Sequence, residues 1–123
     1  MTAGVGIDFY IASSRKEIPR SENNYVKFEE DLQDYLLKKE GDPAKKYGLL
    51  LNLDQYSDRV FSAKEVNELV LICEHLLNEY SVTAKKPWEV DKITRGINLF
   101  AEELKTLCLT ALDQKKKVFA VGD

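Results

Sequence analysis

Few side chains in this 123-residue chain are of the types that carry out catalysis. His75 is the one histidine, and no serine or cysteine stands at a helical offset that would bring a nucleophile to its ring. Nucleophilic catalysis needs such a base, itself oriented by a third group. Glu102 and Glu103 are adjacent, so on a helix they point apart and cannot act as a carboxylate pair. We therefore expect no catalytic residues and no enzyme, and we predict that His75 lies on the surface.

Ligands for metals and phosphates are equally sparse. Asp54 and Asp58 could offer oxygens to a hard cation, but the segment lacks the ligand density and the glycine of an EF-hand loop. Gly4 and Gly6 precede a strand pattern instead of following one, which is the wrong order for a phosphate-binding turn. The sequence therefore predicts neither a metal site nor a cofactor.

The two cysteines have a structural interpretation. Cys73 and Cys108 each fall within an apolar helical stripe, at a spacing typical of neither a CxxC redox motif nor a zinc site. We predict that they are reduced and buried, packing as small hydrophobic side chains, with a disulfide between them as the alternative.

Length and composition limit the class of protein. Residues 1–123 have the size of one domain, and 44% hydrophobic with 32% charged residues is typical of a globular protein rather than a disordered one. No apolar run approaches the roughly 18 residues of a membrane span, and the first residues lack the basic start of a secretory signal. We therefore expect a cytoplasmic protein. A net charge of −3 has the wrong sign for binding nucleic acid or anionic lipid.

The most clearly patterned segment begins at Ser62. Ser62 and Glu65 have the spacing of a capping box, and Phe61 precedes the cap at the position of a hydrophobic staple. Apolar residues then recur at steps of three and four, namely Val66, Leu69, Val70, Cys73, Leu76, Leu77 and Tyr80. This pattern predicts a helix over about 62–80 that is buried along one side.

Two further segments have the helical period. Apolar residues share one face between about 24 and 40, where Gly41 and Pro43 supply a stop. The third helix is predicted over about 89–114, after Trp88, with Lys115–Lys117 placed to complement the negative end of its dipole. Gly96 inside it costs about 1 kcal/mol relative to alanine, so we expect another backbone to pack closely there.

Strand patterns occur at the two ends of the chain. Ile7, Phe9 and Ile11 alternate with other residues, which predicts a strand over 6–12. A short apolar run ending before Gly122 predicts a second strand over 117–122 that is buried on both faces. Because an isolated strand needs a partner, we expect these two to pair. The predicted fold class is α+β, with the three helices packed on a small sheet formed by the chain's two ends.

Acidic residues are concentrated on the outer face of the first predicted helix. They are Glu29, Glu30, Asp31 and Asp34, with only Lys27 nearby. Acidic side chains near a helix N-terminus contribute about 0.3–1 kcal/mol to stability, so an ordinary solvated face is one interpretation. The other interpretation is a surface that docks onto a basic partner.

A second motif precedes the helix that begins near Ser62. Asp and Ser side chains there can fix a turn by bonding backbone amides, in a segment with the pattern L-D-x-Y-x-D-x-x-F, whose residues are Leu53, Asp54, Tyr56, Asp58 and Phe61. From Tyr47 onward, this motif, the last long helix and the closing run Val118–Asp123 resemble small bacterial immunity proteins of polymorphic and contact-dependent growth inhibition (CDI) toxin systems.

The resemblance implies a protein whose whole function is binding. An immunity protein neutralises a cognate toxin by forming a stoichiometric complex, and here the toxin is expected to be a basic nuclease whose positive surface accepts carboxylates in place of phosphates. The class binds toxins through idiosyncratic surfaces, so no residue is carried over from it. The four acidic residues are instead candidates by charge. The alternatives are a small-ligand-binding regulatory domain, with a pocket near Trp88, and a structural subunit of a larger complex.

Overall fold

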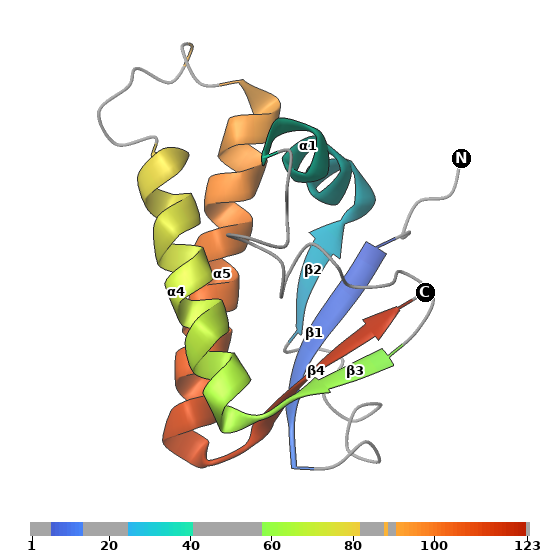
Figure 1. The fold of residues 1–123 in the computed structure, drawn as a ribbon, viewed down its shortest axis with the longest axis vertical. Coiled ribbons are helices and arrows are strands. Elements are labelled where there is room, and N and C mark those ends of the chain that lie inside the picture. The colour runs from blue at the N-terminus through green and yellow to red at the C-terminus, as the bar shows by residue number, and fades with distance from the viewer. Residues whose placement is uncertain (1–5, 14–24, 41–57, 82–87, 89–90, 123) are drawn as a thin grey trace.

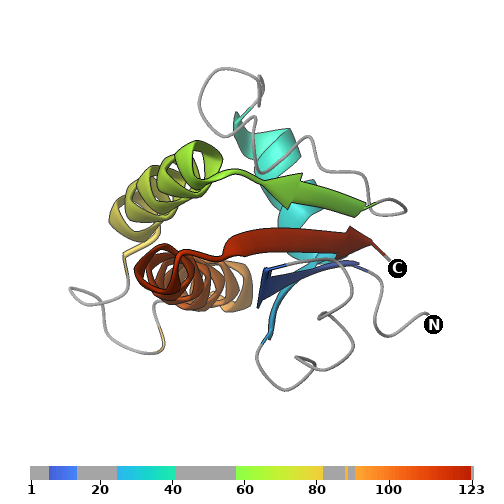
Figure 2. The same cartoon turned by 90° about the horizontal axis from the view of Figure 1, so that it is seen from below.

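The computed structural model describes residues 6–13, 25–40, 58–81, 88 and 91–122. The elements follow the order β1 (Gly6–Ala12), β2 (Tyr25–Glu29), α1 (Glu30–Glu40), β3 (Asp58–Phe61), α4 (Ala63–Glu79), α5 (Lys92–Gln114) and β4 (Lys117–Gly122). The predicted α+β class is confirmed. Helices α4 and α5 run antiparallel to each other along one side of the sheet, and α1 lies beside the first half of α5 (Figure 1). Figure 2 shows α4 and α5 side by side along one side of the sheet.

The sheet is built around the two ends of the chain, as predicted. Its order is β2-β1-β4-β3, and each neighbouring pair is antiparallel. The β1–β4 ladder runs from Ile7 opposite Gly122 to Ala12 opposite Lys117. Strands β2 and β3, which flank this central pair, were not predicted as strands.

The helix predicted over about 24–40 begins later than expected, at Glu30. The prediction is wrong for Tyr25–Glu29, which form β2. Val26 and Phe28 are buried while Tyr25 and Glu29 are exposed, so the segment has the period of a strand. Over five residues this period also fits one turn of a helix, because Tyr25 and Phe28 are three apart. Backbone pairing with β1 decides between the two structures in favour of the strand.

The segment predicted to be a turn before α4 ends as a strand. Asp58 and Phe61 are the first and last residues of β3, whereas Asp54 and Tyr56 lie outside the described residues. Phe61 is fully buried opposite Val118 of β4, and its ring lies 6.3 Å from that of Phe9. Phe61 is therefore a core residue that joins the sheet to the start of α4.

The predicted capping box at Ser62 is confirmed, and α4 begins at Ala63. The Glu65 backbone N–H donates to Ser62 Oγ at 3.3 Å, and the Ser62 N–H donates to Glu65 Oε1 at 3.1 Å. Arg59 also donates to Glu65 Oε2 at 2.6 Å. The hydrogen bond from the Ser62 backbone, with help from Arg59, lowers the pKa of the Glu65 carboxyl. Asp91 is the N-cap of α5, and the Thr94 N–H donates to Asp91 Oδ1 at 2.6 Å. The helix begins at the next residue, Lys92.

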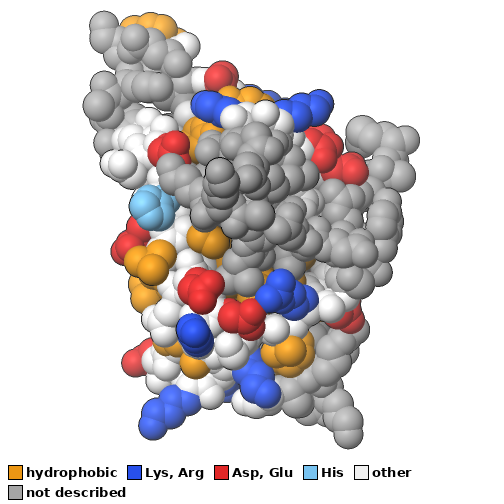
Figure 3. All heavy atoms as spheres, viewed as in Figure 1, with side chains coloured by type: hydrophobic (Ala, Val, Ile, Leu, Met, Phe, Trp, Pro, Cys, Tyr) orange, Lys and Arg blue, Asp and Glu red, His pale blue; other side chains and the backbone are white. Residues whose placement is uncertain are grey.

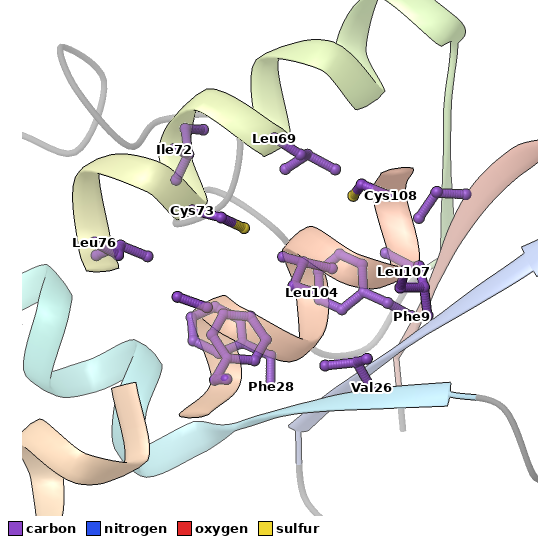
Figure 4. Packing of buried hydrophobic residues seen from close by; sticks show 14 of the residues in the cluster. Phe9, Val26, Phe28, Leu69, Ile72, Cys73, Leu76, Leu104, Leu107 and Cys108 are labelled. Carbon is purple, nitrogen blue, oxygen red and sulfur yellow. The ribbon is translucent and has the colours of Figure 1, made fainter. Parts of the chain in front are cut away.

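The main core lies between the sheet and the two long helices. Figure 4 shows Phe9 and Phe28 projecting from the strands toward side chains such as Leu104 of α5. Cys73 and Cys108 lie in the same core as free thiols, which confirms that they are buried and reduced. Burial raises the pKa of Cys108 to about 12 and also raises that of Cys73, so both thiols are protonated and unreactive at neutral pH.

Gly96 makes room for α1. A Cβ atom added at Gly96 would lie 3.2 Å from Leu32 Cδ2, which is closer than ordinary van der Waals contact. The expected close neighbour is therefore present, but it is a leucine side chain of α1 rather than a backbone. Leu32 is itself buried, so this contact holds α1 against α5.

Lys115 ends α5 in a conformation that favours glycine. Its φ is 58°, in the left-handed region, and its N–H donates to the Ala111 and Leu112 carbonyls. The three lysines were expected to follow the helix, and they do, with Lys117 beginning β4. For an L-residue the left-handed conformation costs about 1–2 kcal/mol, which glycine avoids.

We predict that Lys115→Gly stabilises the protein by about 0.5–1 kcal/mol, after allowance for the greater freedom of glycine in the unfolded chain. Thermal unfolding followed by circular dichroism would show a midpoint raised by a few degrees. Lys116→Gly is the matched control, since Lys115 is the one non-glycine residue with positive φ among those described. An unchanged or lower midpoint for Lys115→Gly would contradict the prediction.

We predict that Glu65→Gln lowers the free energy of unfolding by about 0.5–1 kcal/mol at pH 7, because the cap loses its charge-assisted bonds. The folded-state pKa is lowered, so the carboxylate's contribution is complete above the unfolded-state pKa and is lost as the pH falls through the folded-state value. Urea unfolding at several pH values should show the two proteins converging in acid. Glu68→Gln, an exposed change on the same helix, should show no such trend.

Candidate partner-binding surface

The junction of β2 and α1 positions the acidic residues singled out by the sequence. Strand β2 ends at Glu29 and α1 begins at Glu30, with no residue between them. Phe28 on one side of the junction and Leu32 on the other are buried in the core, so the chain between them is fixed. The intervening side chains point away from the core.

We call Glu29, Glu30, Asp31 and Asp34 the acidic surface. Glu29, Asp31 and Asp34 are exposed, and Glu30 is half-buried. Figure 3 shows acidic side chains at the edge of the molecule where α1 lies. The prediction that these residues share one helix is wrong for Glu29, which ends a strand. The structure nevertheless brings all four residues together, because the strand leads directly into the helix.

Helix stability explains only part of this arrangement. Glu30 and Asp31 occupy the first turn of α1, where the helix dipole favours negative charge. Asp34 lies beyond that turn, three residues from Asp31 and four from Glu30. Like charges at these spacings oppose helix formation by about 0.2–0.5 kcal/mol per pair. Lys38 follows Asp34 by four residues, a spacing that favours an acidic residue before a lysine by a similar amount, so the helix dipole does not account for Asp34.

The nearest described lysines form no ion pair with the acidic surface. Within the described residues, none of its carboxylates takes part in an ion pair. Lys27 bonds instead to Asp8 across the β1–β2 ladder, with Nζ and Oδ1 3.3 Å apart. The ammonium of Lys39 lies 5.7 Å from the Tyr35 ring centroid and 4.8 Å from that of Tyr80. Lys27 and Lys39 therefore have other partners, whereas Lys38 is exposed four residues after Asp34 on the same helix.

A glycine opposite Glu29 keeps this carboxylate without a cross-strand neighbour. Gly6 is the Cα partner of Glu29 in the β1–β2 ladder and has a φ of 155°. A Cβ atom at Gly6 would lie 2.6 Å from the Phe28 carbonyl oxygen, so another residue would have to displace backbone. In the sequence, Gly6 precedes a strand and therefore does not fit a phosphate-binding turn. Its role is to let the two strands approach where the acidic surface begins.

Tyr25 is a surface residue of β2, within the segment that the sequence pattern predicted to be a helix with one apolar face. Its side chain is 46% exposed, and its ring centroid lies 5.6 Å from that of Tyr10, its cross-strand partner. Burial alternates over Tyr25–Glu29, but in the sequence this alternation cannot be distinguished from one turn of a helix, so only the pairing with β1 reveals the exposure of Tyr25.

Other residues weighed in the sequence are scattered. His75 is exposed on α4, as predicted, and Trp88 is 78% exposed. This exposure does not favour an enclosed ligand pocket around the Trp88 ring. In the described ranges, no group of three or more His, Cys, Asp or Glu side chains is placed to hold a metal ion. None of the described helices combines the length and apolar character that crossing a membrane requires.

Comparisons with protein-family models, with curated proteins and with solved structures find no match for this chain. The resemblance to immunity proteins therefore depends on the short motifs in the sequence.

Proposed function

We propose that this chain is an immunity protein, which binds a cognate bacterial toxin and neutralises it in a stoichiometric complex. The observation that carries the proposal is the acidic surface: three exposed carboxylates and a half-buried one, without ion pairs to the residues that the structure describes, on a junction anchored in the core. Clustered charge of one sign on a folded domain costs stability and is characteristic of surfaces that meet a partner of opposite charge.

The proposed partner is a basic nuclease domain. A nuclease attracts nucleic acid through Lys and Arg side chains that contact phosphates. Carboxylates at the acidic surface can occupy the same positions and form charge-assisted hydrogen bonds with those side chains. Inhibition then follows from occupancy, since the toxin cannot bind its substrate while the complex lasts. This mechanism requires no catalytic group in the inhibitor.

The structure of the junction suits rapid and tight binding. Val26 and Phe28 anchor β2, and Leu32 and Leu36 anchor α1, all of them buried in the main core. Because the backbone is already ordered, little conformational entropy is lost when the partner binds. A fixed negative patch also steers a positive partner during diffusion, which raises the association rate.

We predict that the double substitution Glu30→Lys and Asp34→Lys slows association with the cognate toxin domain at least tenfold at low salt. The cause is the loss of electrostatic steering, so the dependence of the rate on ionic strength should also weaken. Stopped-flow mixing of the two purified proteins would measure both effects.

The matched control is Glu102→Lys with Asp113→Lys, which changes the net charge equally on exposed positions of α5. It should slow association far less, because these residues lie outside the acidic surface. Equal rates for the acidic-surface variant and the unmodified chain would refute the surface assignment. Equal slowing by both variants would show that only the net charge matters.

A further inference from the structure

The outer face of the β1–β2 ladder continues the acidic surface along the strand. Three cross-strand pairs follow one another on this face: Tyr10 with Tyr25, Asp8 with Lys27, and Gly6 with Glu29. Alternate residues of a strand point to the same side, so the side chains of Tyr25, Lys27 and Glu29 share this face. The buried residues Val26 and Phe28 occupy the opposite face.

The character of the face changes in steps along β2. At one end, the Tyr25 ring is 46% exposed and rests beside Tyr10. In the middle, Lys27 and Asp8 neutralise each other, and their side chains are only 28% and 19% exposed. At the other end, the exposed carboxylate of Glu29 lies directly before the start of α1. At about 3.3 Å per residue, Tyr25 lies roughly 13 Å from Glu29.

An exposed tyrosine ring and a carboxylate about 13 Å along the same strand can receive different arginine or lysine side chains of one extended segment. One guanidinium group can stack on the face of the tyrosine, and a second basic side chain can bond to the carboxylates. Tyrosine is also enriched among the few residues that dominate binding energy, because its ring buries a large area with few rotatable bonds to fix. Tyr25 has less freedom still, since Tyr10 packs against its ring at a centroid distance of 5.6 Å.

We infer that Tyr25 is the aromatic anchor of the docking surface, and that an arginine- or lysine-bearing segment of the toxin lies along the outer face of β2 from Tyr25 to Glu29. This inference rests on the proposed function. It adds that the bound segment of the toxin extends along β2 as well as over the start of α1. A stable complex buries about 800 Å² on each partner. The acidic surface together with the outer face of β2 forms a longer contact than the first turns of α1 provide.

The test uses Tyr25→Thr, which removes the ring but keeps a residue that favours strands. Dissociation of the complex with the toxin domain should become at least tenfold faster, while association changes little because no charge is altered. This is the opposite kinetic pattern to that of the charge-reversal variant. Tyr25→Phe, which keeps the ring, should dissociate at close to the original rate.

Trp88→Ala is the matched control, because Trp88 is a more exposed aromatic residue, at 78%, on the connection between α4 and α5. It should leave dissociation unchanged. If the unmodified chain binds the toxin and Tyr25→Thr dissociates no faster, the inference is overturned while the proposed function stands. If the unmodified chain forms no complex, both are overturned. Thermal unfolding of Tyr25→Thr would establish that the variant is folded, so that faster dissociation can be assigned to the lost ring.

Discussion

The stacking of the Phe28 ring on the Phe100 ring links β2, at the edge of the sheet, to helix α5. The two ring centroids are 4.4 Å apart with planes 11° from parallel, and both side chains are buried. Such pairs contribute about 0.5–1.5 kcal/mol beyond the burial of their area. Phe28 is the last buried residue of β2 before Glu29, so this contact fixes the point at which the strand becomes α1. Gly96 and Leu32 then fix the direction of the helix, and together these contacts hold the acidic surface in one orientation.

The parts of the fold that depend on local pattern were predictable from the sequence. The capping box at Ser62 fixed the start of α4, long apolar stripes identified α4 and α5, and alternation at Ile7–Ile11 identified β1. Strand β2 was missed because five residues are too short for the periods of helix and strand to differ. Its structure is decided by pairing with β1, a segment distant in sequence. Strand β3 was missed because its one buried side chain, Phe61, matched the position of a hydrophobic staple.

The candidate surface was predictable in composition but not in shape. The concentration of acidic residues is plain in the sequence, whereas the placement of Glu29 on a strand depends on β2. The exposure of Tyr25 and the requirement for glycine opposite Glu29 follow from the same ladder. Whether a charge is neutralised is also a question of tertiary structure: Lys27 is the nearest cation in the sequence, yet it bonds to Asp8. Charge placement, more than charge content, distinguishes the proposed docking surface from an ordinary solvated helix.

The most direct test of the account is protection in living cells. The chain would be co-expressed with the domain encoded by the neighbouring gene as the candidate toxin, with growth scored and the purified mixture resolved on a sizing column. We predict normal growth and a one-to-one complex, and we predict that the charge-reversed chain protects less well. Growth arrest despite abundant soluble expression of the unmodified chain, with no complex on the column, would contradict the central claim.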